Sequence, residues 1–159
     1  MHIFDPTAYC DNSNWVLYID LDMIITGSLD GIASMAGGQV KAFATLTTAE
    51  IFCENVDNGY NSSVMLFDRL KTQHLFQVLD RYYDYLLKYL MRFDHYLEML
   101  VHDAQIIQQL VPGQLIDYSQ HFIQNKQKDL PANCRIVAFP RNPKPHEISD
   151  EWAKHHWIY

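Results

Sequence analysis

The order of apolar and polar positions along the chain predicts four β-strands. Short apolar runs rich in branched and aromatic residues lie at residues 15–19 (WVLYI), 39–45 (QVKAFAT), 63–67 (SVMLF) and 134–139 (CRIVAF). Such runs, bounded by turn-forming residues, are typical of strands. The first run is apolar at every position, which indicates a strand that is buried on both faces.

Between the third and fourth runs the pattern changes to a helical period. Apolar side chains recur every three or four residues from Leu75 to Leu90, which predicts one long helix. A second helix is expected over residues 94–110, ending before a Pro-Gly pair, and the tail at 151–159 favours a short amphipathic helix or turn. Strands and helices alternate, so we expect a single α/β or mixed α+β domain over residues 1–159.

Length and charge narrow the class of protein. The chain has 159 residues, enough for one domain with a core, and its net charge is −7. Residues 1–60 hold eight acidic residues and a single basic one, Lys41. This part is therefore a poor surface for nucleic acid, which needs clustered Lys and Arg. An acidic segment fits a bound cation, although a solvated acidic face that aids solubility explains the same charge.

The cysteines and the N-terminus predict a cytoplasmic protein. Cys10, Cys53 and Cys134 do not have the spacing of a disulfide framework or a metal site, which indicates free thiols in a reducing compartment. The segment MHIFDPTAYC lacks the basic start and apolar stretch of a signal peptide. No apolar run approaches the roughly 18 residues that a membrane-spanning helix needs.

Two carboxylates, Asp20 and Asp22, directly follow the first predicted strand. Residues two apart on extended backbone point to the same side, so both side chains can face one site. Carboxylates that close repel each other unless a proton or a cation relieves the conflict. Mg²⁺ or Mn²⁺ often takes one or two carboxylates together with substrate phosphates. For so short a pattern, capping of a turn or of a helix start is the alternative.

A basic loop follows the last predicted strand. The stretch FPRNPKPHE, residues 139–147, carries Arg141 and Lys144 with no acidic residue before its last position. Prolines on both sides of Lys144 restrict its backbone, and a lysine on a stiff loop after a strand suits a diphosphate. A solvated basic loop is the alternative. Among eight histidines we single out His146, because it follows this loop and no His-Glu-x-x-His pattern is present.

Polar side chains also lead into the third predicted strand. Asn61, Ser62 and Ser63 offer amide and hydroxyl groups where a loop enters the strand. Such groups can hold sugar hydroxyls, and they can equally form an ordinary Asx-type turn. The residues alone leave both interpretations open.

The order and content of these motifs resemble the retaining, nucleotide-sugar-dependent glycosyltransferases of the glycogenin and bacterial lipopolysaccharide galactosyltransferase type, known as family 8. VLYIDLDMIITGSLD is similar to the family's strand with its Asp-x-Asp motif, and GYNSSVMLFD to its Asn-containing strand start. HDAQII stands where the family has Gly-Asp-Gln. CRIVAFPRNPKPHE, with a later tryptophan, is similar to the family's Lys-Pro loop, and the likeness covers residues 15–157.

The resemblance implies a GT-A-like α/β fold for nucleotide-diphospho-sugar transfer and a metal-dependent reaction. It implies that Asp20 and Asp22 hold Mn²⁺ or Mg²⁺, which bridges to the donor diphosphate and stabilises charge on the departing nucleoside diphosphate. Lys144 would add a positive charge to the same phosphates. The family's late histidine ligand has no counterpart just before the Lys-Pro pair, so His146 is considered as a substitute.

The resemblance also implies partners and sugar contacts. Asn61 and Asp103 would contact the transferred sugar or help to position the acceptor. The donor would be a nucleotide sugar, with a UDP-sugar as the first choice. The acceptor would be a carbohydrate, a lipid-linked molecule or a protein.

The family's nucleoside pocket is built from an N-terminal βαβ region before the Asp-x-Asp strand, and one βαβ unit needs about 30 residues. Only fourteen residues precede Trp15, so we expect a partial, C-terminal version of the fold. A first strand without its neighbours would leave an open sheet edge, and an open edge favours self-association.

Two other interpretations remain. An inactive fragment or remnant of such a transferase would keep the fold without the reaction. A haloacid-dehalogenase-type phosphatase also places Asp-x-Asp after an apolar strand, with the first Asp as the nucleophile. That family has Gly-Thr soon after the motif, where this chain has Met23-Ile24-Ile25. Hydrolysis of a generic phosphate ester separates the phosphatase from the transferase.

Overall fold

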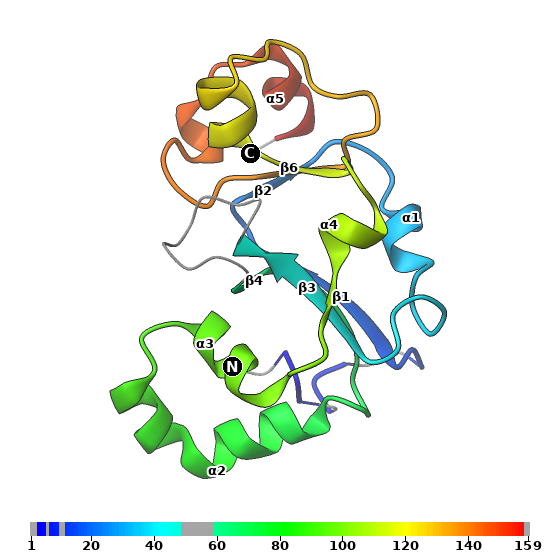
Figure 1. Ribbon diagram of the computed structural model, residues 1–159, viewed down its shortest axis with the longest axis vertical. Helices are drawn as coiled ribbons and strands as arrows, with labels where there is room; N and C mark the ends of the chain where they lie inside the picture. The colour runs from blue at the N-terminus through cyan, green and yellow to red at the C-terminus, as the bar shows by residue number, and fades with distance from the viewer. Residues whose placement is uncertain (1–2, 6, 10–11, 49–58, 158–159) are drawn as a thin grey trace.

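The computed structural model describes residues 3–5, 7–9, 12–48 and 59–157, and within them the strands form two sheets (Figure 1). The larger sheet has the strand order β1-β4-β3-β5 and the smaller one β2-β7-β6. The strands are β1 (Trp15–Ile19), β2 (Met23–Ile25), β3 (Phe43–Thr47), β4 (Tyr60–Asp68), β5 (Gln105–Ile106), β6 (Leu115–Asp117) and β7 (Ile136–Ala138). The helices are α1 (Asp30–Ala33), α2 (Gln73–Tyr89), α3 (Phe93–Leu100), α4 (Ile107–Leu110), the π-helix η2 (Ser119–Gln124), the 3₁₀-helix η3 (Pro145–Glu147) and α5 (Glu151–His156).

Helices cover both faces of the larger sheet, and β4 shows why its sequence is apolar at successive positions. Met65 and Phe67 pack with α2 and α3 on one face. Val64 and Leu66 pack on the other face with side chains of α1 and α4. Because neighbouring residues of a strand point to opposite faces, a strand that is covered on both sides must be apolar throughout.

The smaller sheet packs against the larger one with one face and against a separate apolar cluster with the other. Ile136 and Ala138 of β7 belong to the same core as Val64 and Leu66. Val137 faces the other way and packs in a separate cluster with Ile24, Tyr118, Cys134, Phe139 and Ala153. Figure 1 shows the smaller sheet and α5 at the end of the molecule opposite to α2.

The four predicted strands are confirmed as β1, β3, β4 and β7, but the burial predicted for β1 is wrong, because all of its residues are half-buried at the edge of the sheet. The run at 39–45 becomes a strand only from Phe43, because the N–H of Val40 donates to the carbonyl of Met35 at 2.9 Å and holds Val40 in the preceding turn. The three strands that the pattern does not predict, β2, β5 and β6, are two or three residues long. Runs that short carry no periodic signal of their own.

The long helix predicted from Leu75 to Leu90 is present as α2, but it is kinked at Tyr82, whose φ of −118° and ψ of 21° are not helical. The short C-terminal helix is confirmed as α5. The helix predicted over 94–110 is wrong after Leu100: the chain becomes extended, forms β5 and then turns into α4. The competing interaction is parallel pairing of β5 with β3. The side chain of Gln105 strengthens it by accepting the N–H of Lys41 at 2.9 Å.

β1 lies at an edge of the larger sheet, as expected of a first strand without further neighbours. The carbonyl of Asn14 accepts the N–H of Arg69, directly after β4, and the N–H of Asp20 donates to the carbonyl of Ser63 in β4. Trp15, Leu17 and Ile19 between them therefore direct their backbone groups to the open edge. The Ser13 hydroxyl bonds the N–H and C=O of Trp15 at 3.1 and 3.2 Å. Self-association through this edge stays a prediction.

The cysteines and the helices of the described residues concern the compartment in which the protein works. Cys134 is a buried free thiol, and burial raises its pKa; Cys10 and Cys53 lie outside the described residues. Across the described ranges, no helix has both the length and the apolar character needed to cross a bilayer. The cytoplasmic location stays a prediction.

Candidate functional site

The Asp-x-Asp motif lies in the turn where the chain passes from one sheet to the other. Asp20 and Asp22 follow β1 of the larger sheet and immediately precede β2 of the smaller one. β2 runs antiparallel to β7 with Met23 opposite Ala138, so this register carries Asp22 toward Phe139. The turn therefore places the end of the motif beside the loop that follows β7.

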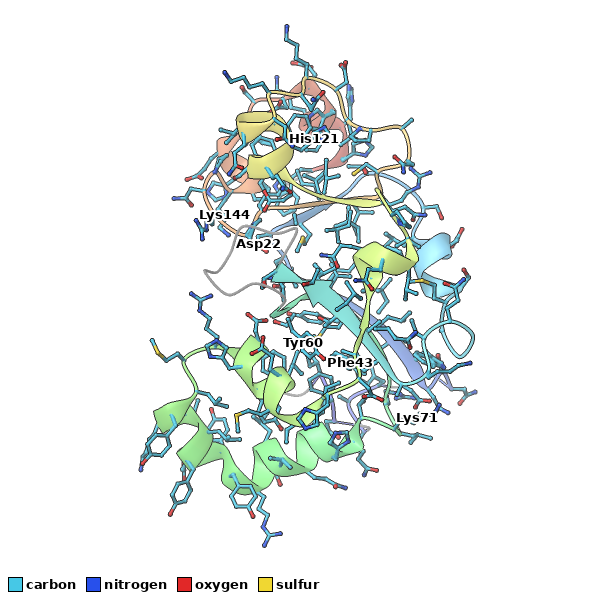
Figure 2. The ribbon with its side chains drawn as sticks, viewed as in Figure 1. Asp22, Phe43, Tyr60, Lys71, His121 and Lys144 are labelled. Atoms are coloured by element: carbon cyan, nitrogen blue, oxygen red, sulfur yellow. The ribbon has the colours of Figure 1, made fainter. Side chains whose placement is uncertain are left out.

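That loop supplies Lys144, which forms an ion pair with Asp22 (Figure 2). The Lys144 ammonium donates to Oδ2 of Asp22 at 2.6 Å and to the carbonyl of Phe139 at 2.8 Å. The two charged side chains are 32% and 39% exposed. An ion pair this exposed contributes only about 0–1 kcal/mol to stability, so its main consequence is the position of the two groups. The structure thus joins two motifs that are 122 residues apart.

The backbone of Lys144 is fixed by the short helix η3 that begins after it. The Lys144 N–H donates to Oε2 of Glu147 at 2.6 Å, and the Glu147 N–H donates back to the Lys144 carbonyl at 2.9 Å. Pro145 between them is buried. This reciprocal capping and the proline limit the directions in which the lysine side chain can leave the backbone. These contacts agree with the stiffness predicted for this loop.

Asp20 is held by β4 and by a tyrosine of its own strand. Its N–H donates to the carbonyl of Ser63 at 2.8 Å, and the Tyr18 hydroxyl donates to its Oδ1 at 2.5 Å. Burial raises the pKa of Tyr18 to about 12, with further contributions from the bond to Asp20 and from the charges of Asp20 and Asp22. Both carboxylates therefore lie close enough to this hydroxyl to disfavour its ionisation.

Tyr18→Phe tests this arrangement. Loss of the bond to Asp20 should lower the free energy of unfolding at pH 7 by about 0.5–1.5 kcal/mol. Folding raises the pKa of Tyr18 from 10.0 to about 12. The wild type should therefore lose stability as the pH rises from 10 to 12, where only the unfolded tyrosine is ionised, and the variant should lose less.

Urea unfolding at pH 7 and at pH 10 to 11 measures both effects. Tyr85→Phe is a matched control, because Tyr85 is 68% exposed and should change neither quantity. Equal pH dependence in the wild type and in Tyr18→Phe would contradict the role given to this hydroxyl.

Asn61 lies next to this region but is already engaged by its neighbours. It is 6% exposed and lies opposite Leu46 of β3. Its Oδ1 accepts the N–H of Ser63 at 3.1 Å, and its carbonyl accepts the Thr45 hydroxyl at 2.7 Å. The first of these bonds is the predicted Asx-type turn. Contact of Asn61 with a sugar stays a prediction.

Asp103 and His146 lie outside the cluster around Asp22. Asp103 is exposed and precedes β5, which starts beside Ala44, whereas Asn61 pairs with Leu46 farther along β3. His146 is exposed in η3. In the part of the chain that the structure describes, no three His, Cys, Asp or Glu side chains gather closely enough to hold a metal ion. The roles of Asp103 and His146 stay predictions.

The two carboxylates of the motif suit a hard cation that keeps other ligands. Asp20 and Asp22 offer oxygen atoms, which Mg²⁺ and Mn²⁺ prefer. Such ions commonly bind through one or two carboxylates plus substrate phosphates and waters. The Lys144 ammonium already lies against one oxygen of Asp22, so a cation would share this carboxylate with the lysine. Binding of Mn²⁺ or Mg²⁺ by Asp20 and Asp22 stays a prediction.

Sequence reasoning missed a second polar group at the same edge of the smaller sheet. β6 runs parallel to β7 with Asp117 opposite Ala138, so both strands end near the Asp22 turn. Asp117 is buried, and its Oδ1 accepts the N–H of Gln120 at 3.0 Å, which fixes the start of η2. A cavity of about 150 Å³ lies here, lined by Asp117, Gln120 and His121 among others. The sequence does carry a signal for this group: in Leu115-Ile116-Asp117 an apolar pair is followed by Asp, as in Tyr18-Ile19-Asp20.

The comparisons with known proteins identify relatives by fold. No protein-family model matches the chain, and no curated protein matches its sequence. The apo-form glycosyltransferase GlyE of Streptococcus pneumoniae TIGR4 superposes with a TM-score of 0.57 at 19% identity, over 91% of this chain and 37% of GlyE. The galactosyltransferase LgtC, solved in complex with donor and acceptor sugar analogs, superposes with a TM-score of 0.59 at 12% identity, over 95% of this chain and 64% of LgtC.

These likenesses establish the class of fold. The chain has a mixed α/β, GT-A-like glycosyltransferase fold, which confirms the fold implied by the motifs. It spans less than two thirds of either solved glycosyltransferase, in agreement with a partial version of that fold.

Proposed function

We propose that this chain is part of a metal-dependent glycosyltransferase, which moves a sugar from a nucleoside-diphosphate sugar to an acceptor hydroxyl. The observation that carries the proposal is the ion pair of Asp22 with Lys144. It brings the Asp-x-Asp motif and the Lys-Pro loop to one point of a fold that is shared with GlyE and LgtC.

Each side chain of the pair has capacity left for a ligand. An ammonium group has three N–H donors, and Lys144 uses two of them on Asp22 and Phe139. The third can bind a phosphate oxygen, because the side chain is 32% exposed. Asp20 and Asp22 would hold Mn²⁺ or Mg²⁺, which when bound stabilises the negative charge that develops on the departing nucleoside diphosphate. Tyr18 orients Asp20 for that task by fixing one of its oxygens.

The remaining residues would act on the sugar side of the donor. Asn61 lies in β4, two residues before Ser63, whose carbonyl accepts the N–H of Asp20. Asn61 is therefore close to the Asp-x-Asp motif, and this position suits contact with the transferred sugar. Asp103 is the weaker candidate, because it precedes β5 away from Asn61. We propose a UDP-sugar donor and an acceptor that is a carbohydrate, a lipid-linked molecule or a protein.

An inactive relative of such enzymes is the second candidate, and one observation favours it. Among the described residues no third metal-ligating side chain joins Asp20 and Asp22. The phosphatase interpretation receives no support from the comparisons, because GlyE and LgtC, which this chain resembles in fold, are glycosyltransferases.

A screen of sugar nucleotides separates these possibilities. The 159-residue protein is incubated with several UDP- and GDP-sugars, with and without Mn²⁺, and release of the nucleoside diphosphate is measured. A transferase should show release that needs Mn²⁺ and is lost in Asp22→Ala. Metal-dependent binding without release would identify the inactive relative, and absence of both would contradict the proposed site.

A further inference from the structure

The first residues of β4 extend beyond the end of β1. β1 pairs with β4 only as far as Val64, which lies opposite Ile19, because the chain then leaves the strand for the Asp-x-Asp turn. Tyr60 and Asn61 pair with β3 on their other side. We call residues 60–63 the projecting start of β4. Its backbone N–H groups on the side of β1 need partners other than a strand.

Two half-buried carboxylates of α3 supply those partners. The N–H of Tyr60, beside α3 in Figure 2, donates to Oε1 of Glu98 at 2.8 Å. The N–H of Ser62 donates to Oδ1 of Asp94, also at 2.8 Å. Two residues along a strand span about 6.6 Å, and four residues along a helix rise about 6 Å. Carboxylates one helical turn apart therefore match the spacing of alternate strand N–H groups.

α3 is a firm support for these two carboxylates. Tyr96 and Leu97, which lie between them in sequence, are buried in the core on one face of the larger sheet. The Tyr96 hydroxyl also donates to the carbonyl of Leu75 in α2. Because a close-packed core holds the backbone of the helix, the positions of Asp94 and Glu98 follow from that packing.

A buried amide holds the opposite edge of the same pair of strands. Oε1 of Gln108 in α4 accepts the N–H of Thr47 at 3.1 Å, and Nε2 of Gln108 donates to the Thr47 carbonyl at 3.0 Å. Thr47 lies opposite Tyr60. Side chains of two helices thus hold the end of β3 and the projecting start of β4 from both sides.

An edge lined with charged side chains can serve only to prevent pairing with another chain. The position of Asn61 indicates a further role. Asn61 stands between Tyr60 and Ser62, the two residues that α3 holds, and it is the residue proposed for contact with the sugar. Ser63 is tied to the Asp-x-Asp turn instead, because its carbonyl accepts the N–H of Asp20 at 2.8 Å. The carboxylates of α3 therefore act on Asn61 more directly than on the turn.

We propose that Asp94 and Glu98 are positioning residues, which set the place of Asn61 relative to the Asp-x-Asp turn and thereby the affinity for the sugar of the donor. Both act through the backbone N–H groups that they accept and need no contact with the donor. This role rests on the proposed function, because it concerns the sugar half of a nucleoside-diphosphate sugar. Without the two carboxylates the chain should hold UDP as before but hold the attached sugar less well.

Calorimetric titration of the full chain with UDP-galactose and with UDP, both in the presence of Mn²⁺, tests this role. Asp94→Ala combined with Glu98→Ala should weaken UDP-galactose binding about threefold to tenfold, as for the loss of one hydrogen bond, and UDP binding by about twofold at most. Asp94→Asn combined with Glu98→Gln should restore most of the affinity, because amide oxygens still accept the two N–H groups. Asp80→Ala combined with Asp84→Ala is the charge control, since both carboxylates are exposed on α2.

The side-chain amide signals of Asn61 in a ¹⁵N spectrum give a second readout that needs no ligand. They should shift in the double alanine variant and return in the amide variant, and Asp94→Ala alone serves if the double variant does not fold. Equal losses for UDP-galactose and UDP, no loss for either, no recovery in the amide variant, or unchanged Asn61 signals would overturn the positioning role and leave the proposed function standing. A wild type that binds neither ligand would overturn the proposed function, and this role with it.

Discussion

Asp22→Ala should abolish the metal-dependent part of nucleoside-diphosphate binding. Asp22 is the residue at which the motif, the end of β7 and Lys144 meet, so its removal takes away one of two carboxylate ligands and the partner of the lysine. We expect UDP to bind at least tenfold more weakly in the presence of Mn²⁺, which is about 1.4 kcal/mol, and Mn²⁺ to have little further effect. Calorimetric titration of UDP with and without Mn²⁺ measures both quantities.

The matched control for this variant is Asp30→Ala. Asp30 is an exposed carboxylate in the first turn of α1, and its loss changes the net charge by the same amount. Asp22→Ala should remain folded, because its side chain is 39% exposed and its ion pair contributes little to stability. Unchanged binding in Asp22→Ala would remove the site assignment, and an unfolded variant would favour the capping interpretation of the motif.

Lys144→Ala should weaken nucleoside-diphosphate binding by about 1.5–3 kcal/mol, the range for hydrogen bonds to charged groups. Lys144→Arg should not restore full affinity, because a guanidinium does not reproduce the point charge that contacts both Asp22 and Phe139. Arg141→Ala is the matched control: Arg141 is an exposed cation of the same loop, and no motif position corresponds to it. Equal and negligible effects of the two alanine variants would mean that the loop is merely solvated.

The affinity for Mn²⁺ without nucleotide is a second quantity that Lys144→Ala should change, and the expected change is opposite in sign to the loss of nucleotide affinity. In the wild type the ammonium lies 2.6 Å from Oδ2 of Asp22, where it repels any cation that approaches the same carboxylate. Lys144→Ala should therefore bind Mn²⁺ alone at least as tightly as the wild type does. Weaker binding of Mn²⁺ alone would show that the lysine supports the metal ligands and does not compete with the metal.

The sequence predicts those parts of the fold that depend on local periodicity. β1, β4 and α2 are long enough for an alternating, continuous or helical pattern to be recognised. β2 and β6 consist of three residues each and exist because β7, up to 115 residues away along the chain, supplies their hydrogen bonds. The boundary between α3 and β5 is hidden for the same reason, since β3 rather than the local sequence stops the helix.

The candidate site likewise contains residues that the sequence predicts and residues that it does not predict. The Asp-x-Asp turn and the Lys-Pro loop could be predicted separately, and their order resembled a known family, so their meeting at Asp22 was implied. The bonds of the Tyr18 hydroxyl to Asp20 and of Lys144 to the Phe139 carbonyl were not predicted, although their partners are only two and five residues apart, because they depend on side-chain orientation that an apolar pattern does not contain. The register of β5 with β3 separates Asp103 from Asn61 along β3, and the role of Asp103 stays a prediction.

Paramagnetic broadening by Mn²⁺ tests the central claim most directly. Amide signals of the ¹⁵N-labelled chain are recorded with UDP while Mn²⁺ is added below stoichiometric amounts. If Asp20, Asp22 and Lys144 form a metal–diphosphate site, the signals of residues 20–22 and 139–144 should broaden first, and those of α2 should stay sharp. Broadening elsewhere, or sharp signals at Asp20 and Asp22, would contradict a nucleotide-sugar site at this turn.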